Sequence, residues 1–275
     1  MLPPIVLAFF AAAFASFAEL DAPNKPPSKA ELAAIAKRGK DLAGYDQAAW
    51  HASDAFQAKV PKPSGVARYI ARKTDKGWMV SFGRLNESKS KFLIAYEATP
   101  SKGQAPNDFS VESFDPPKAD AGFFLSSARA IETSLKDFTE HFEGRPRPYN
   151  VAVLPTSKNA YFVYLFPAPT KPNVWPLGGD VRYLVSDDGT KILEKRRLHK
   201  SVIEIEPPKD KDQQPVSGIH NHVLTDVPED TDVFYVLARK PEMPEMISTK
   251  HFLFVVEIGG ETKYVGKSDD VPKKK

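Results

Sequence analysis

The strongest constraint on the fold is an apolar stripe in residues 120–142. Apolar side chains recur there at alternating steps of four and three residues, at Phe124, Ala128, Ile131, Leu135, Phe138 and Phe142. This period predicts one amphipathic helix, and the Gly-Arg-Pro at 144–146 is typical of a helix end. Strand-like runs flank the helix on both sides, so we expect the stripe to pack on a sheet.

The segment before this helix has the pattern of a four-strand antiparallel meander. Trp78, Val80 and Phe82 alternate with less apolar neighbours, as a half-buried strand requires. The predicted strands cover residues 67–71, 77–82, 92–97 and 109–114.

A helix is predicted ahead of the meander. Ser28 and Glu31 have the spacing of a capping box, which marks a helix start. Gly39 and Gly44 lower the helix propensity of the residues that follow. We therefore expect the helix to break near Gly44.

The chain after residue 146 is predicted to be mostly strand. Asp-Asp-Gly-Thr at 187–190 is a strong hairpin turn signal, and Pro228 favours a short helix over residues 229–239. The predicted strands cover residues 150–154, 161–166, 181–186, 191–196, 201–206, 215–219, 246–249 and 252–258. The fold class expected is α+β, with an N-terminal helix plus four-strand antiparallel meander, a long amphipathic helix, and a mostly antiparallel β second half with one short helix.

The N-terminus has the pattern of an export signal. An uninterrupted apolar run is followed by small residues that suit cleavage near Ala18. It is shorter than a spanning helix, and no other segment is apolar enough to cross a membrane, so we expect a secreted or periplasmic protein without a transmembrane segment after cleavage. The predicted organisation is a signal peptide at 1–18, a Pro-rich linker at 19–27, a helix plus antiparallel sheet unit at 28–117, a helix plus β-rich unit at 118–266 and a disordered tail at 267–275.

Composition excludes several classes of function. The chain has no cysteine, which excludes thiol catalysis and a Cys-ligated zinc site. Its formal net charge of +3 is small and dispersed, so no nucleic-acid partner is expected. The densest basic stretch, residues 195–200, is interpreted as the solvated face of a strand.

The most informative motif is the His-x-His of His220 and His222. Residues 215–219 predict a strand that leads into it, and side chains two apart on a strand leave the same face. Both imidazoles can then bind one divalent metal ion, with Asp232 as a third ligand. The alternative is that Asp226 and Asp230 cap or turn the backbone and the two histidines form local hydrogen bonds.

Residues 216–232 resemble the zinc motif of the JAB/MPN (JAMM) metallopeptidases. The resemblance implies that His220, His222 and Asp232 bind zinc and that a strand glutamate, Glu204 or secondarily Glu206, is the general base that activates zinc-bound water. The chain departs from the family at positions 223 and 229, where the family has Pro and Ser. The strings at 45–50 and 228–234 also resemble uncharacterised exported bacterial proteins, which implies no activity.

Three hypotheses follow for function. The first is an exported, non-catalytic protein that binds a peptide or an envelope component, with no certain cofactor. The second is a zinc-dependent hydrolase, a peptidase or amidase that uses the His-x-His and Asp232, and the third is a metal-binding protein without turnover. Whether the protein is an enzyme is left open.

Two further groups of residues are candidates for binding. Asp46, His51 and Asp54 flank Trp50 on the first predicted helix. Trp175 belongs to a set of aromatic residues that suit a glycan or a peptide, with core packing as the alternative.

Overall fold

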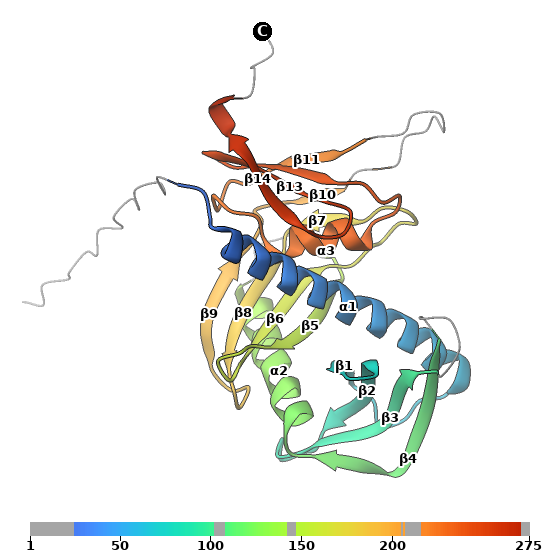
Figure 1. Ribbon diagram of the computed structural model, residues 1–275. Helices are drawn as coiled ribbons and strands as arrows, with labels where there is room; N and C mark the ends of the chain where they lie inside the picture. Colours follow the sequence, from blue (N-terminus) through green and yellow to red (C-terminus); the bar gives the residue numbers. More distant parts are fainter. Residues whose placement is uncertain (1–24, 102–107, 142–146, 205, 207–215, 271–275) are drawn as a thin grey trace, which may run out of the picture.

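The structure is a computed structural model that describes residues 25–101, 108–141, 147–204, 206 and 216–270, and its fold is α+β as expected (Figure 1). The predicted signal peptide, linker residues 19–24 and residues 271–275 of the predicted tail lie outside the described residues. No helix in the described part of the chain is long and apolar enough to cross a membrane.

The first helix, α1 (Lys29–Lys59), is continuous over 31 residues, so the break predicted near Gly44 is wrong. It begins as predicted, because Ser28 and Glu31 form a complete capping box. Its glycines admit close neighbours instead of ending the helix. A Cβ at Gly39 would lie 2.4 Å from the Val233 Cβ, and one at Gly44 would lie 2.6 Å from the Trp78 Nε1.

The predicted meander is confirmed as an antiparallel sheet in the order β1-β2-β3-β4. Ile70, Val80 and Phe92 turn buried side chains towards the core. The strands are β1 (Arg68–Thr74), β2 (Gly77–Leu85), β3 (Phe92–Pro100) and β4 (Phe109–Asp120).

The helix with the apolar stripe is α2 (Phe123–His141), and it packs on sheets as predicted. Its side chains Phe124, Ala128 and Ile131 are buried. It contacts the first sheet and three strands of a second antiparallel sheet. The order of that sheet is β5-β6-β8-β9, with β5 (Tyr149–Pro155), β6 (Ala160–Pro167), β8 (Val181–Ser186) and β9 (Ile192–Arg197).

A two-stranded ribbon stands beside the second sheet. It pairs β7 (Pro176–Gly178) with β10 (Val202–Glu204). The predicted turn at 187–190 joins β8 and β9, which confirms the hairpin.

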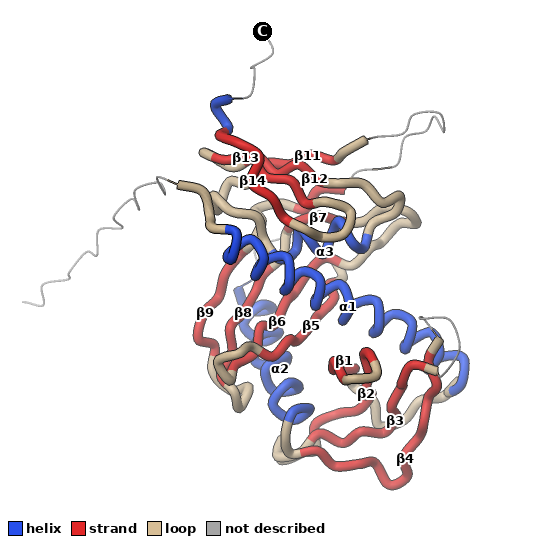
Figure 2. The backbone as a smooth tube through the Cα atoms, viewed as in Figure 1, coloured by secondary structure: helices blue, strands red, loops and turns tan. Residues whose placement is uncertain are grey.

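The third sheet has the order β11-β12-β13-β14 and lies against the other side of α1, as Figures 1 and 2 show. Its strands are β11 (Gly218–Asn221), β12 (Glu245–Ser248), β13 (Phe252–Val256) and β14 (Thr262–Lys267). The pair β11 and β12 is parallel, and the other pairs are antiparallel. The short helix α3 (Asp230–Ala238) connects β11 to β12 and packs against α1.

Two clusters of buried apolar residues hold the described chain together. The larger one joins α1, α2 and the first two sheets. The smaller one joins Leu32 and Ile35 of α1 to Val233 of α3 and Phe254 of β13. The helix α1 therefore contributes to both clusters. The helix α3 and the third sheet pack against one side of it.

Candidate metal centre

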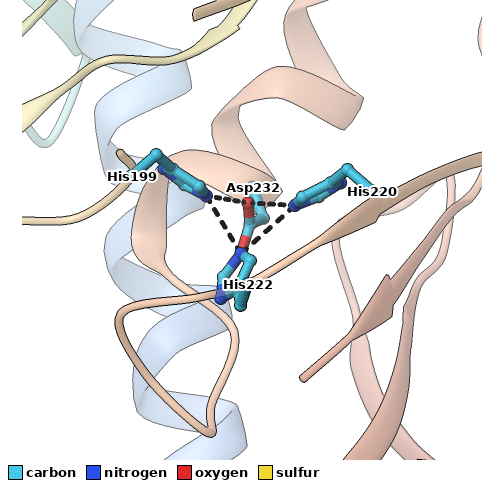
Figure 3. Close-up of side chains that lie close together, drawn as sticks. All are labelled: His199, His220, His222 and Asp232. Carbon is cyan, nitrogen blue, oxygen red and sulfur yellow. Dashed lines mark hydrogen bonds and ion pairs between the residues drawn. The ribbon is translucent and has the colours of Figure 1, made fainter. Parts of the chain in front are cut away.

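Three structural units bring four donor side chains together (Figure 3). His199 lies two residues after β9, at the open end of the β8–β9 hairpin. His220 is on β11 and His222 directly follows that strand, while Asp232 is in the first turn of α3. All four side chains are buried, and their nearest donor atoms lie within 4.8 Å of one another.

The His-x-His lies on an extended backbone, as the sequence predicts. His220 pairs with Ile247 in the parallel ladder of β11 and β12. The backbone N–H of His222 then donates to the Ser248 carbonyl at 2.8 Å, which prolongs the extended segment by one pair. Because side chains alternate on such a backbone, both imidazoles face the same side.

The start of α3 orients Asp232. This residue is the third of the helix, and its Oδ2 accepts a hydrogen bond of 2.7 Å from the backbone N–H of Glu229, the N-cap residue. The other oxygen, Oδ1, lies 3.0 Å from His199 Nε2 and 3.2 Å from His220 Nε2. One carboxylate thus begins the helix and also faces the histidines.

The three imidazoles present their Nε2 atoms to one another. The Nε2 of His222 lies 2.9 Å from that of His199 and 3.2 Å from that of His220. It also lies 3.2 Å from the Oδ2 of Asp232. Figure 3 shows His199 and His220 on opposite sides of the group, with His222 and Asp232 between them.

Each Nδ1 points away from the group and meets a hydrogen-bond acceptor. The Nδ1 of His199 is 2.8 Å from Asp180, and that of His220 is 2.9 Å from Glu245. The Nδ1 of His222 is 2.9 Å from the Val227 carbonyl, which can only accept. These acceptors place the proton of each neutral ring on Nδ1, which leaves three Nε2 lone pairs directed at one another and at Asp232. Such a contact is repulsive unless a cation lies within it.

The charge of the surroundings also requires a cation. Asp180, Asp232 and Glu245 are three buried carboxylates. Arg239 offsets one of them through an ion pair of 2.6 Å with Glu245. A divalent cation would neutralise the remaining charge, and buried charge without compensation is costly.

The shifts in the pKa values of Asp232 and His220 also favour positive charge at this site. Burial raises the pKa of Asp232, but the neighbouring His222 and His199 more than reverse this and hold it well below its usual range. Burial lowers the pKa of His220, but its hydrogen bonds to Asp232 and Glu245 raise it to about 9. A cation, either a proton or a metal ion, therefore belongs to this site.

A pocket of about 270 Å³ opens beside the three imidazoles. Leu198, Ile203 and Leu224 give it apolar walls, and Ser201 and Asn221 add polar groups. Among the residues that the structure describes, no carboxylate lines it. The metal-capable group is therefore buried but has a space on one side in which a small ligand fits.

The structure does not bring Glu204 to this group. Glu204 lies on β10, where its Oε1 accepts a hydrogen bond of 2.8 Å from Arg147. Glu206 pairs with Lys171 at 3.1 Å. Of the residues named from the sequence, the structure brings together His220, His222 and Asp232, and it leaves both glutamates outside.

Two acidic residues offered as simple caps have other partners. The Asp226 carboxylate accepts from the backbone N–H of His251 and lies 2.8 Å from its Nδ1. Asp230 is fully buried and binds two arginines and a tyrosine.

Sequence reasoning missed His199. It lies in the basic stretch 195–200, which was interpreted as a solvated face, and that interpretation is wrong for Leu198 and His199 because both are buried. The available signal was the apolar Leu198 beside the imidazole. No short spacing motif links His199 to His220, since their contact depends on how two sheets pack.

No protein-family model, curated protein or solved structure matched this chain. The resemblance of residues 216–232 to the JAB/MPN motif therefore rests on those residues alone.

Proposed function

We propose that this protein binds one divalent transition-metal ion through His199, His220, His222 and Asp232. The observation that carries the proposal is the orientation of the three rings. Each Nδ1 is held by an acceptor, so each Nε2 offers its lone pair to the same point. Metal-bound histidines commonly have such an outer partner, because it fixes the ring and its tautomer.

The separations of the donors suit a small divalent ion. Donors about 2.0–2.2 Å from a tetrahedral zinc ion lie about 3.3 Å from one another. Two of the nitrogen pairs lie 2.9 Å and 3.2 Å apart, each nitrogen lies 3.0–3.2 Å from one or the other Asp232 oxygen, and one donor atom from each of the four residues lies within 4.8 Å of the others. Three imidazoles and a carboxylate favour zinc, iron or manganese over ions that prefer thiolates.

We propose binding without turnover as the principal role. Four protein donors fill a tetrahedral zinc site, as in structural zinc centres, whereas catalytic zinc sites keep one position for water. The bound ion would join the end of the β8–β9 hairpin to β11 and α3. The proposed export of this metal-binding protein rests on the N-terminal apolar run, residues 1–18.

Zinc-dependent hydrolysis is the second candidate. The pocket of about 270 Å³ favours it, because all three imidazoles form part of its lining. The pairing of Glu204 with Arg147 counts against the base that the family resemblance implies. A hydrolase would also need a position for water on the ion, either by release of one ligand or by expansion to five ligands.

Metal analysis of the purified protein tests the proposal. We expect close to one metal ion per chain, and we expect His199→Ala and His222→Ala to lose it. His141→Ala is the matched control, because His141 is exposed and ends α2. Metal-free wild-type protein that takes up no zinc, iron or manganese would overturn the proposal, as would equal metal contents in the three variants.

A further inference from the structure

A second pocket, of about 600 Å³, lies on another face of α3, between α1 and the loop that carries Trp175. Its walls are mostly aromatic and apolar, with Trp50, Tyr69, Phe166, Trp175 and Tyr235 among them. Its size is typical of sites for small organic molecules. The His–Asp group does not line it, so it is independent of the proposed metal site.

One carboxylate lines this apolar pocket, and no described residue forms an ion pair with it. Asp46 lines it, and among the described residues its carboxyl group has neither a hydrogen bond nor an ion pair. Burial raises the pKa of Asp46 to about 6, so the group is ionised in neutral solution. Neither oxygen of this carboxylate is among the fully buried side-chain atoms that lack a hydrogen-bond partner, so the carboxylate stays open to the pocket and a cationic ligand can pair with it.

The positive group that lines the pocket is already engaged. Lys171 forms an ion pair of 3.1 Å with Glu206, and both side chains are more than half exposed. It leaves Asp46 unneutralised. The guanidinium of Arg239 lies over the Tyr235 ring, 4.7 Å from its centroid, so the face of that ring is occupied as well.

Two tryptophans remain available to a ligand. Trp50 is 58% exposed and follows Asp46 by one helical turn on α1. The His51 ring stacks on one face of the Trp50 ring, with the centroids 4.9 Å apart, so the opposite face is the one that a ligand would use. Trp175 faces the same pocket from the loop before β7 and is half-buried. Tryptophan rings attract cations through their electron-rich faces, and the attraction adds to that of a carboxylate.

We propose that this pocket binds an amphiphilic organic cation, with its ammonium group beside Asp46 and its apolar body against Trp50 and Trp175. The carboxylate supplies charge selectivity and the aromatic walls supply contact area. The observations favour a small molecule, because the pocket has the volume of a small-molecule site and is lined by α1, α3 and the loop of residues 168–175.

Three probes with one shared body test the charge selectivity. The full chain is titrated calorimetrically at pH 7.5 with 4-phenylbutylamine, 4-phenylbutan-1-ol and 4-phenylbutyrate. We expect the amine to bind about tenfold or more tightly than the alcohol, and the carboxylate to bind most weakly. Equal affinities for the amine and the alcohol would overturn the proposal, as would no binding of the amine up to about 10 mM.

Substitution of Asp46 tests whether the amine binds beside this carboxylate. Asp46→Asn should weaken amine binding about tenfold and leave alcohol binding unchanged. Asp54→Asn is the matched control, because it removes the same charge from an exposed position on α1 outside the pocket lining. Equal weakening by the two substitutions would refute a specific site.

A third variant tests the aromatic wall. Trp50→Ala should weaken the amine about threefold or more, because the ring face is lost. Circular dichroism checks that each variant is folded, and Asp46→Asn is expected to fold at least as well as wild type since it removes an unpaired charge. An unchanged amine affinity in Trp50→Ala would contradict the proposed position of the ligand.

Discussion

Asp230 and Asp232 are two fully buried carboxylates in the first turn of α3, and their surroundings differ in kind. Asp230 receives hydrogen bonds from Arg38 at 2.8 Å, Arg182 at 2.6 Å and Tyr164 at 2.8 Å. Those partners carry their own positive charge or a proton. Asp232 accepts one backbone hydrogen bond, from Glu229, and its other partners are three imidazoles whose Nδ1 atoms already face acceptors.

The difference separates a structural ion pair from a binding site. The protein neutralises Asp230 with its own permanently charged guanidinium groups. Around Asp232 it supplies lone pairs and additional carboxylates, so the missing charge must come from outside as a proton or a metal ion. The two centres lie two residues apart in sequence, and we expect them to respond differently to substitution and to chelators.

The largest effect is expected at the self-neutralised centre. Asp230→Asn leaves the buried Arg182 without its full counter-charge and should lower the free energy of unfolding by about 3–5 kcal/mol. Urea denaturation measures the loss, which should be the same with and without a chelator. A loss that appears only in metal-loaded protein would break the distinction between the two centres.

Metal removal is expected to have a comparable or smaller effect. A ligand present at a thousand times its dissociation constant stabilises the native state by about 4 kcal/mol. Dialysis against a chelator should therefore lower the melting temperature of wild type and of Asp54→Asn, but not that of His222→Ala. Calorimetry measures the melting temperatures of the three proteins. A wild-type melting temperature that the chelator does not change would contradict the difference between the two centres.

The outer partners of the histidines come next. Glu245→Gln weakens the acceptor for the Nδ1 of His220 and should reduce metal affinity about 10–100-fold. Competition with a fluorescent chelator measures the affinity. Glu257→Gln serves as control, because Glu257 directly follows β13 and pairs with the exposed Lys263. Identical affinities for the two variants would mean that Glu245 does not orient the site.

The smallest effect is expected at Glu204. It is partly exposed and pairs with Arg147, so Glu204→Gln should cost less than about 1 kcal/mol and leave the metal content unchanged. Metal analysis and a peptide-library assay check both points. Peptide hydrolysis by wild type that this substitution abolishes, with the metal retained, would favour the hydrolase over binding without turnover.

Local pattern predicted most of the elements because their burial repeats along the chain. The stripe of α2 and the alternation of Trp78, Val80 and Phe82 each report one buried face. The strand β14 has no alternation of buried and exposed residues to reveal it in the sequence, since most of its side chains are exposed. At Gly44, α1 lies directly against Trp78 from another element, and propensity alone does not contain such a contact.

The candidate site divides in the same way. His220, His222 and Asp232 were found because a strand and a helix start place them by local rules. His199 and Asp180 enter from a hairpin of another sheet, and their basic and polar neighbours resemble an exposed turn. Glu204 was expected on a strand as a general base, but it pairs with Arg147, which is distant in the sequence, and no local pattern predicts that contact.

The uninterrupted course of α1 has a consequence for how the whole molecule melts. Leu32 and Ile35 belong to one apolar cluster, and Leu42 and Phe56 belong to the other. Helix formation is cooperative along the length of a helix. Loss of packing in one cluster should therefore also destabilise the part of α1 that packs in the other cluster. We therefore expect the two clusters to unfold together, and we expect an ion bound beside β11 to slow the opening of strands that it does not contact.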